Sequence, residues 1–421
     1  MFQTVNATGD SSRGELTQTP ENGTLFDAIP VAAPVYSLPS AGRFRFPGAR
    51  RNFPSGEVTL PQPRIVALRR AMRAERVDRF LVTCPEHVRW LSGFSGSSAW
   101  LVVGTREKVL LTDFRYRDQA AAQAPDWRAV ITQNGLVACV RELAAGWGDS
   151  RVGFESAHLT VKDHRALTSP FKDGDTPLKV QWVATEQIIE RELFVKDEAE
   201  IAAIARSAAI ADAAFAEVLP LVKPGVTERD LAAELEYRVR KLGADRMAFP
   251  PIVASGPNAA LPHAQPSDRR IRTGDMVTFD IGAQRDGYAS DMTRTIAVGK
   301  ASKKLQKVYG IVLEAQMRAV AAVRPGLSCV ELDGVARSYI QEQGFAEAFG
   351  HSLGHGVGLR VHDGPSISWR SQETLAEGMV ITIEPGIYLT GWGGVRIEDL
   401  AVVTGKGCRV LCSTPKELRI V

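Results

Sequence analysis

The segment V-K-P-G-V-T-E-R-D-L at residues 222–231 recurs later in the chain as V-R-P-G-L-S-C-V-E-L at residues 323–332. In each copy a long helical stretch precedes Pro-Gly. A Thr or Ser followed three residues later by an acid then predicts the capped start of a second helix. These capping pairs are Thr227 with Asp230 and Ser328 with Glu331. The repeat predicts two structurally related halves.

Both halves continue in the same way after the second helix. That helix ends near Gly243 in the first half and near Gly344 in the second, which fits a glycine C-cap. The strand signals G-D-M-V-T-F-D (274–280) and G-M-V-I-T-I-E (378–384) follow. Two helix–helix–hairpin units packed around a pseudo-twofold axis are therefore expected, in an α/β (α+β) fold.

Each predicted hairpin carries a pair of carboxylates. Asp280 and Asp291 flank the turn-rich stretch Q-R-D-G-Y. If the strands fold back around Arg285 and Asp286, position 280 lies opposite position 291, with both side chains on one face.

The second hairpin repeats this arrangement. Glu384 and Glu398 flank T-G-W-G-G, and the turn is expected near Gly391. Two hairpins that each offer a carboxylate pair can hold two cations about 3.5–4 Å apart.

The charge of these side chains indicates what they bind. Four carboxylates carry about four negative charges at neutral pH, which two divalent cations would balance. Without a cation the buried anions would repel one another. With His355 of G-H-G-V-G as a fifth ligand, the oxygen-rich set suits two Mn²⁺ ions, with Co²⁺ or Zn²⁺ as substitutes. The predicted metal ligands are Asp280, Asp291, His355, Glu384 and Glu398.

Several motifs around these ligands resemble a known family. They are P-H-A-Q-P (262–266), H-S-L-G-H-G-V-G-L-R-V-H-D-G-P (351–365), T-I-E-P-G-I-Y (382–388) and G-G-V-R-I-E-D (393–399). Together they closely resemble the metallopeptidases that include prolidase and aminopeptidase P. L-S-G-F-S-G-S-S (91–98) and L-T-D-F-R-Y (111–116) are typical of the creatinase-like N-terminal domain of that family. The resemblance implies a "pita-bread" catalytic domain.

The resemblance also implies roles for individual residues. Asp291 and Glu398 would bridge the two metals, Asp280 would complete one shell, and His355 with Glu384 would complete the other. The expected catalytic residues are His263, His351, His362 and Glu384, the last also moving a proton to the leaving nitrogen. The expected substrate-binding residues are His263, His362 and Arg396. Arg396 is interpreted either as a partner of the substrate carboxylate or as a support for the metal ligands.

The implied reaction is hydrolysis of the bond between an N-terminal residue and proline. This amide lacks an N–H group, so proteases that grip that donor fail on it. The expected partner is thus a peptide with proline at its second position, and Phe249 could wall the proline pocket. Whether dipeptides or longer peptides are preferred stays open.

Two alternative functions are a non-catalytic peptide-binding protein on the same fold and a creatinase-like amidinohydrolase. Both would be expected to lose the metal ligands.

Composition predicts three regions and excludes several classes of partner. Residues 1–60, rich in Gly, Ser and Pro, are expected to be a disordered extension. Residues 61–190 alternate strand and helix signals and are expected to form the creatinase-like domain, and residues 191–421 are expected to form the catalytic domain.

A net charge of +3 argues against nucleic-acid binding, and no stretch is apolar enough to span a membrane. A cytoplasmic homodimer or higher homo-oligomer is expected.

The remaining histidines and the cysteines give no further site from spacing alone. His87, His158 and His164 have no companions at ligand spacing, which favours structural or surface roles. The five cysteines are scattered without a C-x-x-C motif, so they are expected to be reduced thiols.

Overall fold

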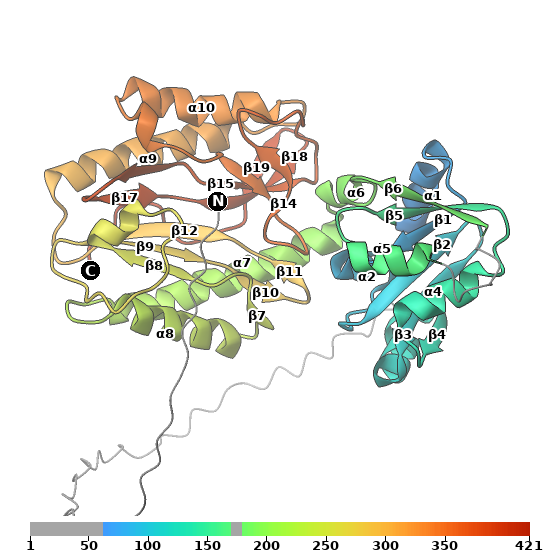
Figure 1. The fold of residues 1–421 in the computed structure, drawn as a ribbon. Coiled ribbons are helices and arrows are strands. Elements are labelled where there is room, and N and C mark those ends of the chain that lie inside the picture. The colour runs from blue at the N-terminus through green and yellow to red at the C-terminus, as the bar shows by residue number, and fades with distance from the viewer. Residues whose placement is uncertain (1–61, 170–178) are drawn as a thin grey trace, which may run out of the picture. The chain divides into compact units, whose positions relative to one another are not determined.

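The computed structural model describes residues 62–169 and 179–421. The predicted disordered extension, residues 1–60, lies outside the described residues. Within them, the chain forms an α/β domain followed by a larger domain in which helix pairs enclose β-sheets (Figure 1). The predicted fold class is confirmed.

The first domain is built on a six-stranded mixed sheet with the order β4-β3-β2-β1-β5-β6. Its strands are β1 (Arg79–Val82), β2 (Ala99–Gly104), β3 (Lys108–Asp113), β4 (Arg128–Thr132), β5 (Ser150–Glu155) and β6 (Val180–Thr185). Its helices are α1 (Gln62–Ala74), α2 (Pro85–Ser92), η1 (Phe114–Tyr116), α3 (Arg117–Gln123), α4 (Leu136–Ala144), α5 (Val161–Thr168) and α6 (Glu190–Phe194). The side chains of the edge strands β4 and β6 are mostly half-buried or exposed.

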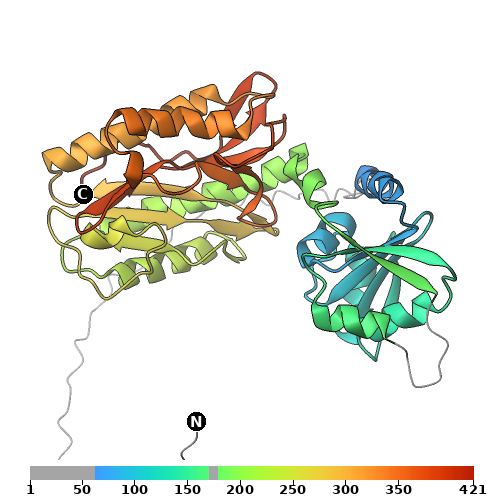
Figure 2. The same cartoon turned by 45° about the horizontal axis from the view of Figure 1, so that its top comes forward.

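Two helix pairs frame the second domain. They are α7 (Glu198–Val218) with α8 (Glu228–Lys241), and α9 (Lys303–Ala322) with α10 (Cys329–Glu342). In Figures 1 and 2 the pairs lie on opposite sides of the strands. Both predicted capping boxes are present, at the starts of α8 and α10. Gly243 and Gly344 follow these helices with φ of 99° and 85°, as expected of C-terminal caps.

Between the helix pairs lie the strands that carry the predicted ligands. The first half contributes β7 (Arg246–Met247), β8 (Ile252–Ser255), η3 (Gly256–Ala260), β9 (Met276–Ile281), β10 (Ala283–Arg285), β11 (Tyr288–Ala289) and β12 (Met292–Ala297). The second half contributes β13 (Gly354–Gly356), β14 (Asp363–Ile367), β15 (Val380–Ile383), β16 (Gly386–Leu389), β17 (Gly393–Arg396), β18 (Asp399–Thr404) and β19 (Gly407–Val410). The remaining short helices are η2 (Leu219–Leu221) and η4 (Ala346–Ala348).

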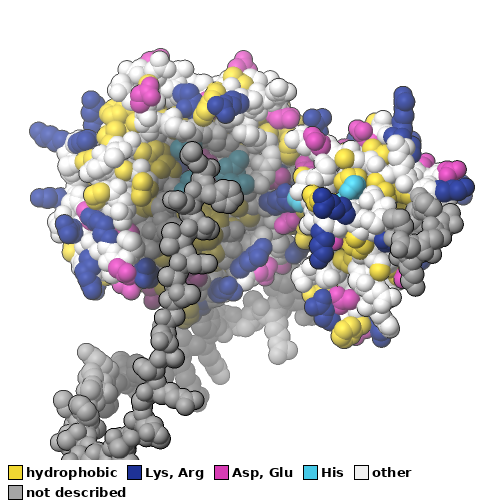
Figure 3. Space-filling model, viewed as in Figure 1, with side chains coloured by type: hydrophobic (Ala, Val, Ile, Leu, Met, Phe, Trp, Pro, Cys, Tyr) yellow, Lys and Arg dark blue, Asp and Glu magenta, His cyan; other side chains and the backbone are white. Residues whose placement is uncertain are grey.

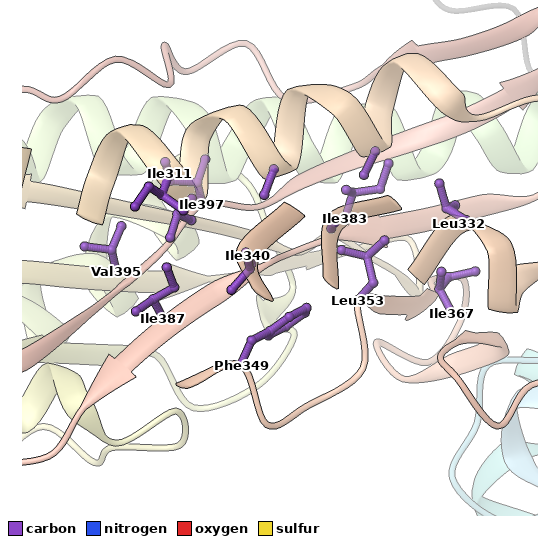
Figure 4. Close-up of a cluster of buried hydrophobic side chains, with 14 of the residues drawn as sticks. Ile311, Leu332, Ile340, Phe349, Leu353, Ile367, Ile383, Ile387, Val395 and Ile397 are labelled. Atoms are coloured by element: carbon purple, nitrogen blue, oxygen red, sulfur yellow. The ribbon is translucent and has the colours of Figure 1, made fainter. Parts of the chain in front are cut away.

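A large apolar core holds the second half together. It lies between α9, α10 and the strands β15–β18 (Figure 4). Its buried members include Ile311, Leu332, Ile340, Phe349, Leu353, Ile383, Ile387, Val395 and Ile397. Burying such side chains contributes roughly 1.5–3 kcal/mol each. This packing fixes the strands β15 and β18, next to which Glu384 and Glu398 lie.

The first hairpin corrects one sequence-based expectation. Asp280 pairs with Thr293, not with Asp291. Arg285 pairs with Tyr288, so the turn is formed by Asp286 and Gly287, with φ of 51° and 77°. Positive φ at both central residues is the signature of the Asp-Gly type I′ turn, which had been placed one residue too early. The resulting shift is two residues, which keeps Asp280 and Asp291 on one face as a diagonal pair.

The second hairpin has the expected register. Ile383 pairs with Asp399, and Leu389 pairs with Gly393 across the turn centred on Gly391. Glu384 and Glu398 thus lie opposite each other.

In the part of the chain that the structure describes, no helix has both the length and the apolarity needed to cross a bilayer.

Candidate metal centre

The structure brings the five predicted metal ligands to the junction of the two halves. Asp280 lies in β9, and Asp291 directly precedes β12. His355 lies in β13, while Glu384 follows β15 and Glu398 precedes β18. The halves are joined here by backbone hydrogen bonding, because the N–H of Glu398 donates to the carbonyl of Thr293 over 3.1 Å.

Distances between the side chains are those of a ligand cluster. Nε2 of His355 lies 3.4 Å from Oε1 of Glu384 and 3.7 Å from Oδ2 of Asp291. Asp291, His355 and Glu398 each offer a ligand atom within 4.8 Å of the others. A single cation could contact all three.

Neighbouring groups fix the orientation of His355. Its Nδ1–H donates to the carbonyl of Gly356 over 3.0 Å, which turns Nε2 toward the carboxylates. Its backbone N–H donates to Oγ1 of Thr382 over 3.0 Å. Thr382 also donates to Oε1 of Glu384 over 3.3 Å, so one threonine supports two predicted ligands.

The glycines beside His355 allow close backbone approach. A Cβ on Gly354 would lie 2.1 Å from the carbonyl oxygen of Thr382. A Cβ on Gly356 would lie 1.8 Å from the carbonyl oxygen of Gly364. Neither site has room for a side chain.

Asp280 is held by only one of its oxygens. Oδ2 accepts a hydrogen bond of 2.7 Å from Nη2 of Arg396. Oδ1 is buried and has no hydrogen-bond partner among the described residues. An unpaired buried carboxylate oxygen is costly, and a metal ion would satisfy it.

Electrostatics at the centre oppose ionisation of the carboxylates in the absence of a cation. Burial and the neighbouring Glu398, Asp280 and Glu384 raise the pKa of Asp291 well above its usual range. Burial, Glu384 and Asp280 act in the same direction on the pKa of Glu398. For Glu384, burial and Asp280 raise the pKa to about 8 despite the nearby Arg396. Two divalent cations would remove this repulsion.

The predicted histidines line the same cleft as the ligands. The cleft has a volume of about 600 Å³. Figure 3 shows histidine side chains set back in a hollow of this domain. The predicted site residues that line it are His263, Asp280, Asp291, His351, His355, His362, Glu384, Arg396 and Glu398.

A residue that the sequence analysis missed, Tyr388, connects two members of the site. Nη1 of Arg396 donates to the Tyr388 hydroxyl over 2.9 Å, and this hydroxyl lies 3.0 Å from Nε2 of His351. Nδ1–H of His351 donates to the carbonyl of Ser352 over 2.8 Å, so Nε2 accepts from Tyr388. Burial and the nearby Arg396 lower the pKa of His351 to about 4, which keeps this imidazole neutral. The sequence motif T-I-E-P-G-I-Y includes Tyr388. Its contacts with Arg396 and His351, however, depend on how β16 pairs with β17, which the motif does not reveal.

Arg396 itself is committed to protein acceptors. Besides Asp280 and Tyr388, it donates to Oγ1 of Thr293 over 2.9 Å and to the carbonyl of Pro262 over 3.3 Å. Only 4% of its side chain is exposed. Of the two interpretations made from the sequence, this geometry favours support of a metal ligand over capture of a substrate carboxylate.

A buried glutamate anchors the loop that carries His263. Glu228, at the start of α8, accepts hydrogen bonds from the backbone and side chain of Ser255 at 2.6 and 2.7 Å. It also accepts from the backbone and side chain of Ser267 at 3.1 and 2.6 Å. These contacts close the loop at both ends and place His263 over the cleft.

Comparison with known proteins agrees with this architecture. Residues 202–405 match metallopeptidase family M24, and residues 64–191 match the creatinase/prolidase N-terminal domain. The uncharacterized peptidase YqhT of Bacillus subtilis (strain 168) is 39% identical over 345 residues, which are 82% of this chain and 96% of that protein. The chain belongs to metallopeptidase family M24. Like other members, it is expected to bind divalent metal ions, and the residues assembled here fit them.

Solved structures of M24 proteins show the same fold. The Xaa-Pro dipeptidase from Bacillus anthracis is 40% identical, with a TM-score of 0.82 over 85% of this chain and 99% of that chain. The X-Pro aminopeptidase from Thermotoga maritima MSB8 is 36% identical, with a TM-score of 0.77 over 84% of this chain and 100% of that chain.

Proposed function

We propose that this M24 chain is a two-metal peptidase that hydrolyses the bond between an N-terminal residue and proline. The observation that carries the proposal is the convergence of Asp280, Asp291, His355, Glu384 and Glu398, from five separate strands or strand ends, on one cleft. Two relatives of the same fold bear the names Xaa-Pro dipeptidase and X-Pro aminopeptidase, which supports this substrate class.

These five residues would hold two divalent ions, with Asp291 and Glu398 as the bridging pair. Mn²⁺ is the proposed native metal because four carboxylates and one imidazole form an oxygen-rich set. When bound, such a pair lowers the pKa of a water molecule and polarises a carbonyl oxygen.

The chain's own groups supply proton transfer and orientation. Glu384 lines the cleft beside the other ligands and is proposed to take a proton on its carboxylate and deliver it to the leaving nitrogen of proline. Neutral His351 is held by Tyr388 at the edge of the cleft, and His263 and His362 are proposed to contact the substrate. Arg396 is assigned to the orientation of Asp280.

The cleft also offers an apolar wall for the proline ring. Phe249, Pro250, Pro251 and Ile252 line it together with the ligands. Stacking a pyrrolidine ring on such side chains buries apolar area without requiring an N–H donor from the substrate. This supports the preference for proline.

Turnover tests the proposal. Protein loaded with Mn²⁺ should cleave a dipeptide and a tripeptide that share one Xaa-Pro bond, and their relative rates decide between the dipeptidase and aminopeptidase P-like subtypes. Matched peptides with alanine in place of proline are the control. Failure to cleave either Xaa-Pro peptide, with metal bound, would favour a non-catalytic peptide-binding protein. Sedimentation of the same sample tests the predicted homodimer or higher homo-oligomer.

A further inference from the structure

A second group of side chains that could hold a metal ion lies in the N-terminal domain, and none of its members lines the catalytic cleft. Cys84, His87 and His158 each place a ligand atom within 4.8 Å of the others. Cys84 caps the start of α2, His87 lies in its first turn, and His158 lies in the loop after β5. Sequence spacing gave no sign of this group, because 71 positions separate His158 from the nearer of the other two.

We propose that Cys84, His87 and His158 form a site for a borderline or soft divalent cation, for which Zn²⁺ is the natural choice. One thiolate and two imidazoles are ligands that zinc prefers, in contrast to the oxygen-rich catalytic centre. Glu86 is available as a fourth ligand, since its Oε2 lies 3.0 Å from Sγ of Cys84.

A buried carboxylate orients the ligands from behind. Glu155 contacts Nδ1 of His87 through one oxygen, and its other oxygen accepts from the backbone N–H of Cys84 over 2.9 Å. Because Nδ1 of His87 is engaged, Nε2 is the nitrogen left to bind a metal. A carboxylate behind a metal-bound imidazole is the usual support for such a ligand. Glu155 is only 4% exposed, so this support is built into the core.

The guanidinium group of Arg360 already occupies the position proposed for the cation. Nη2 of Arg360 lies 2.8 Å from Sγ of Cys84, 3.1 Å from Nε2 of His158 and 3.4 Å from Oε2 of Glu86. A single cationic nitrogen therefore contacts three of the four proposed ligands. The Arg360 side chain is 36% exposed and can turn into solvent when a metal takes its place.

A cavity lies beside the carboxylate that supports His87. A cavity of about 470 Å³ in this domain is lined by Glu155 and Glu190. Oε1 of Glu190 lies 3.9 Å from Nε2 of His158, whose side chain is 21% exposed. The group is thus supported on one side by the buried Glu155 and is partly exposed on the other side, at His158.

Metal binding must release protons from the group. Burial alone would lower the pKa of His87, but hydrogen bonds with Cys84 and Glu155 raise it to about 10. Burial and Arg360 lower the pKa of His158, so that imidazole is already neutral. Coordination would release the proton on His87 to solvent, so binding is best measured at mildly alkaline pH.

Cobalt absorption tests the site independently of peptidase activity. Co²⁺ is added to the full-length protein with its catalytic centre already loaded with Mn²⁺. A thiolate bound to Co²⁺ gives a charge-transfer band in the near ultraviolet, which carboxylate and imidazole ligands do not give. We expect this band in the wild type and its loss in Cys84→Ser. Arg360→Ala should reach saturation at a lower Co²⁺ concentration.

Two further variants keep the test decisive. Cys412 lies near the catalytic centre, with Sγ 3.8 Å from the carbonyl oxygen of Asp291, so Cys412→Ser is the matched control and should retain the band. His158→Ala removes a ligand at the exposed edge and should weaken or shift the band even if Cys84→Ser does not fold. Absence of the band from both the wild type and Arg360→Ala, or its persistence in Cys84→Ser, would overturn the proposal.

Discussion

Nη2 of Arg396 donates to Oδ2 of Asp280 over 2.7 Å, while Oδ1 of the same carboxylate is buried without a hydrogen-bond partner among the described residues. One oxygen is thus hydrogen-bonded to the protein, and the other is available to bind a cation. Arg396 comes from the second half of the catalytic domain and Asp280 from the first, so this pair also links the halves.

Replacing Arg396 by methionine should weaken metal binding. The substitution keeps the volume of the stem but removes the donor that orients Asp280, and loss of such a support typically costs about 10–100-fold in metal affinity or activity. Calorimetric titration with Mn²⁺ measures the change. Arg318→Met, in an exposed ion pair on α9, is the control and should bind Mn²⁺ like the wild type.

Asp291→Ala should abolish loading of the metal pair and nearly all turnover, because Asp291 is the proposed bridging ligand. Metal analysis after gel filtration should show fewer than two ions per chain. Asp126→Ala, an exposed position before β4, should leave both properties unchanged. Two tightly bound ions and near-native rates in Asp291→Ala would refute the bridging role.

Gly354→Ala should destabilise the protein by about 1–3 kcal/mol, since the new methyl group would meet the backbone of Thr382. It should also reduce metal affinity by displacing His355. The midpoint of urea denaturation reports the first effect. Gly334→Ala on α10, where an added Cβ meets nothing within 4 Å, should be neutral or slightly stabilising.

The metal-free protein should lose stability as the pH rises. Glu384 has a folded-state pKa of about 8, raised chiefly by burial from an ordinary value of 4.5. Its protonated form therefore stabilises the folded state fully below about pH 4.5, and this contribution is lost as the pH rises to about 8. The melting temperature of chelated protein should fall across this range. The pKa values of Asp291 and Glu398 are raised as well, so Glu384→Gln, which carries no charge, should make the fall less steep; an equally steep fall in that variant would contradict the explanation.

Much of the fold was predictable because its signals are local. The capping boxes of α8 and α10 lie within four residues each, and the repeat they belong to predicted the two halves. The register of the first hairpin was wrong because the Asp286–Gly287 turn was placed one residue early, although the Asp-Gly signal was present in the sequence.

Long-range side-chain contacts were the least predictable part. The hydrogen bond from Tyr388 to His351 and the grouping of Cys84 and His87 with His158 depend on how distant strands and loops pack. The motifs around the catalytic ligands could be recognised from the sequence, but no motif reveals contacts of this kind.

The most direct test of the account is anomalous diffraction from crystals grown with Mn²⁺. We predict two manganese peaks about 3.5–4 Å apart. Asp291 and Glu398 should contact both ions, while Asp280 contacts one and His355 with Glu384 contact the other. A single ion, or a pair bound elsewhere in the chain, would contradict the account.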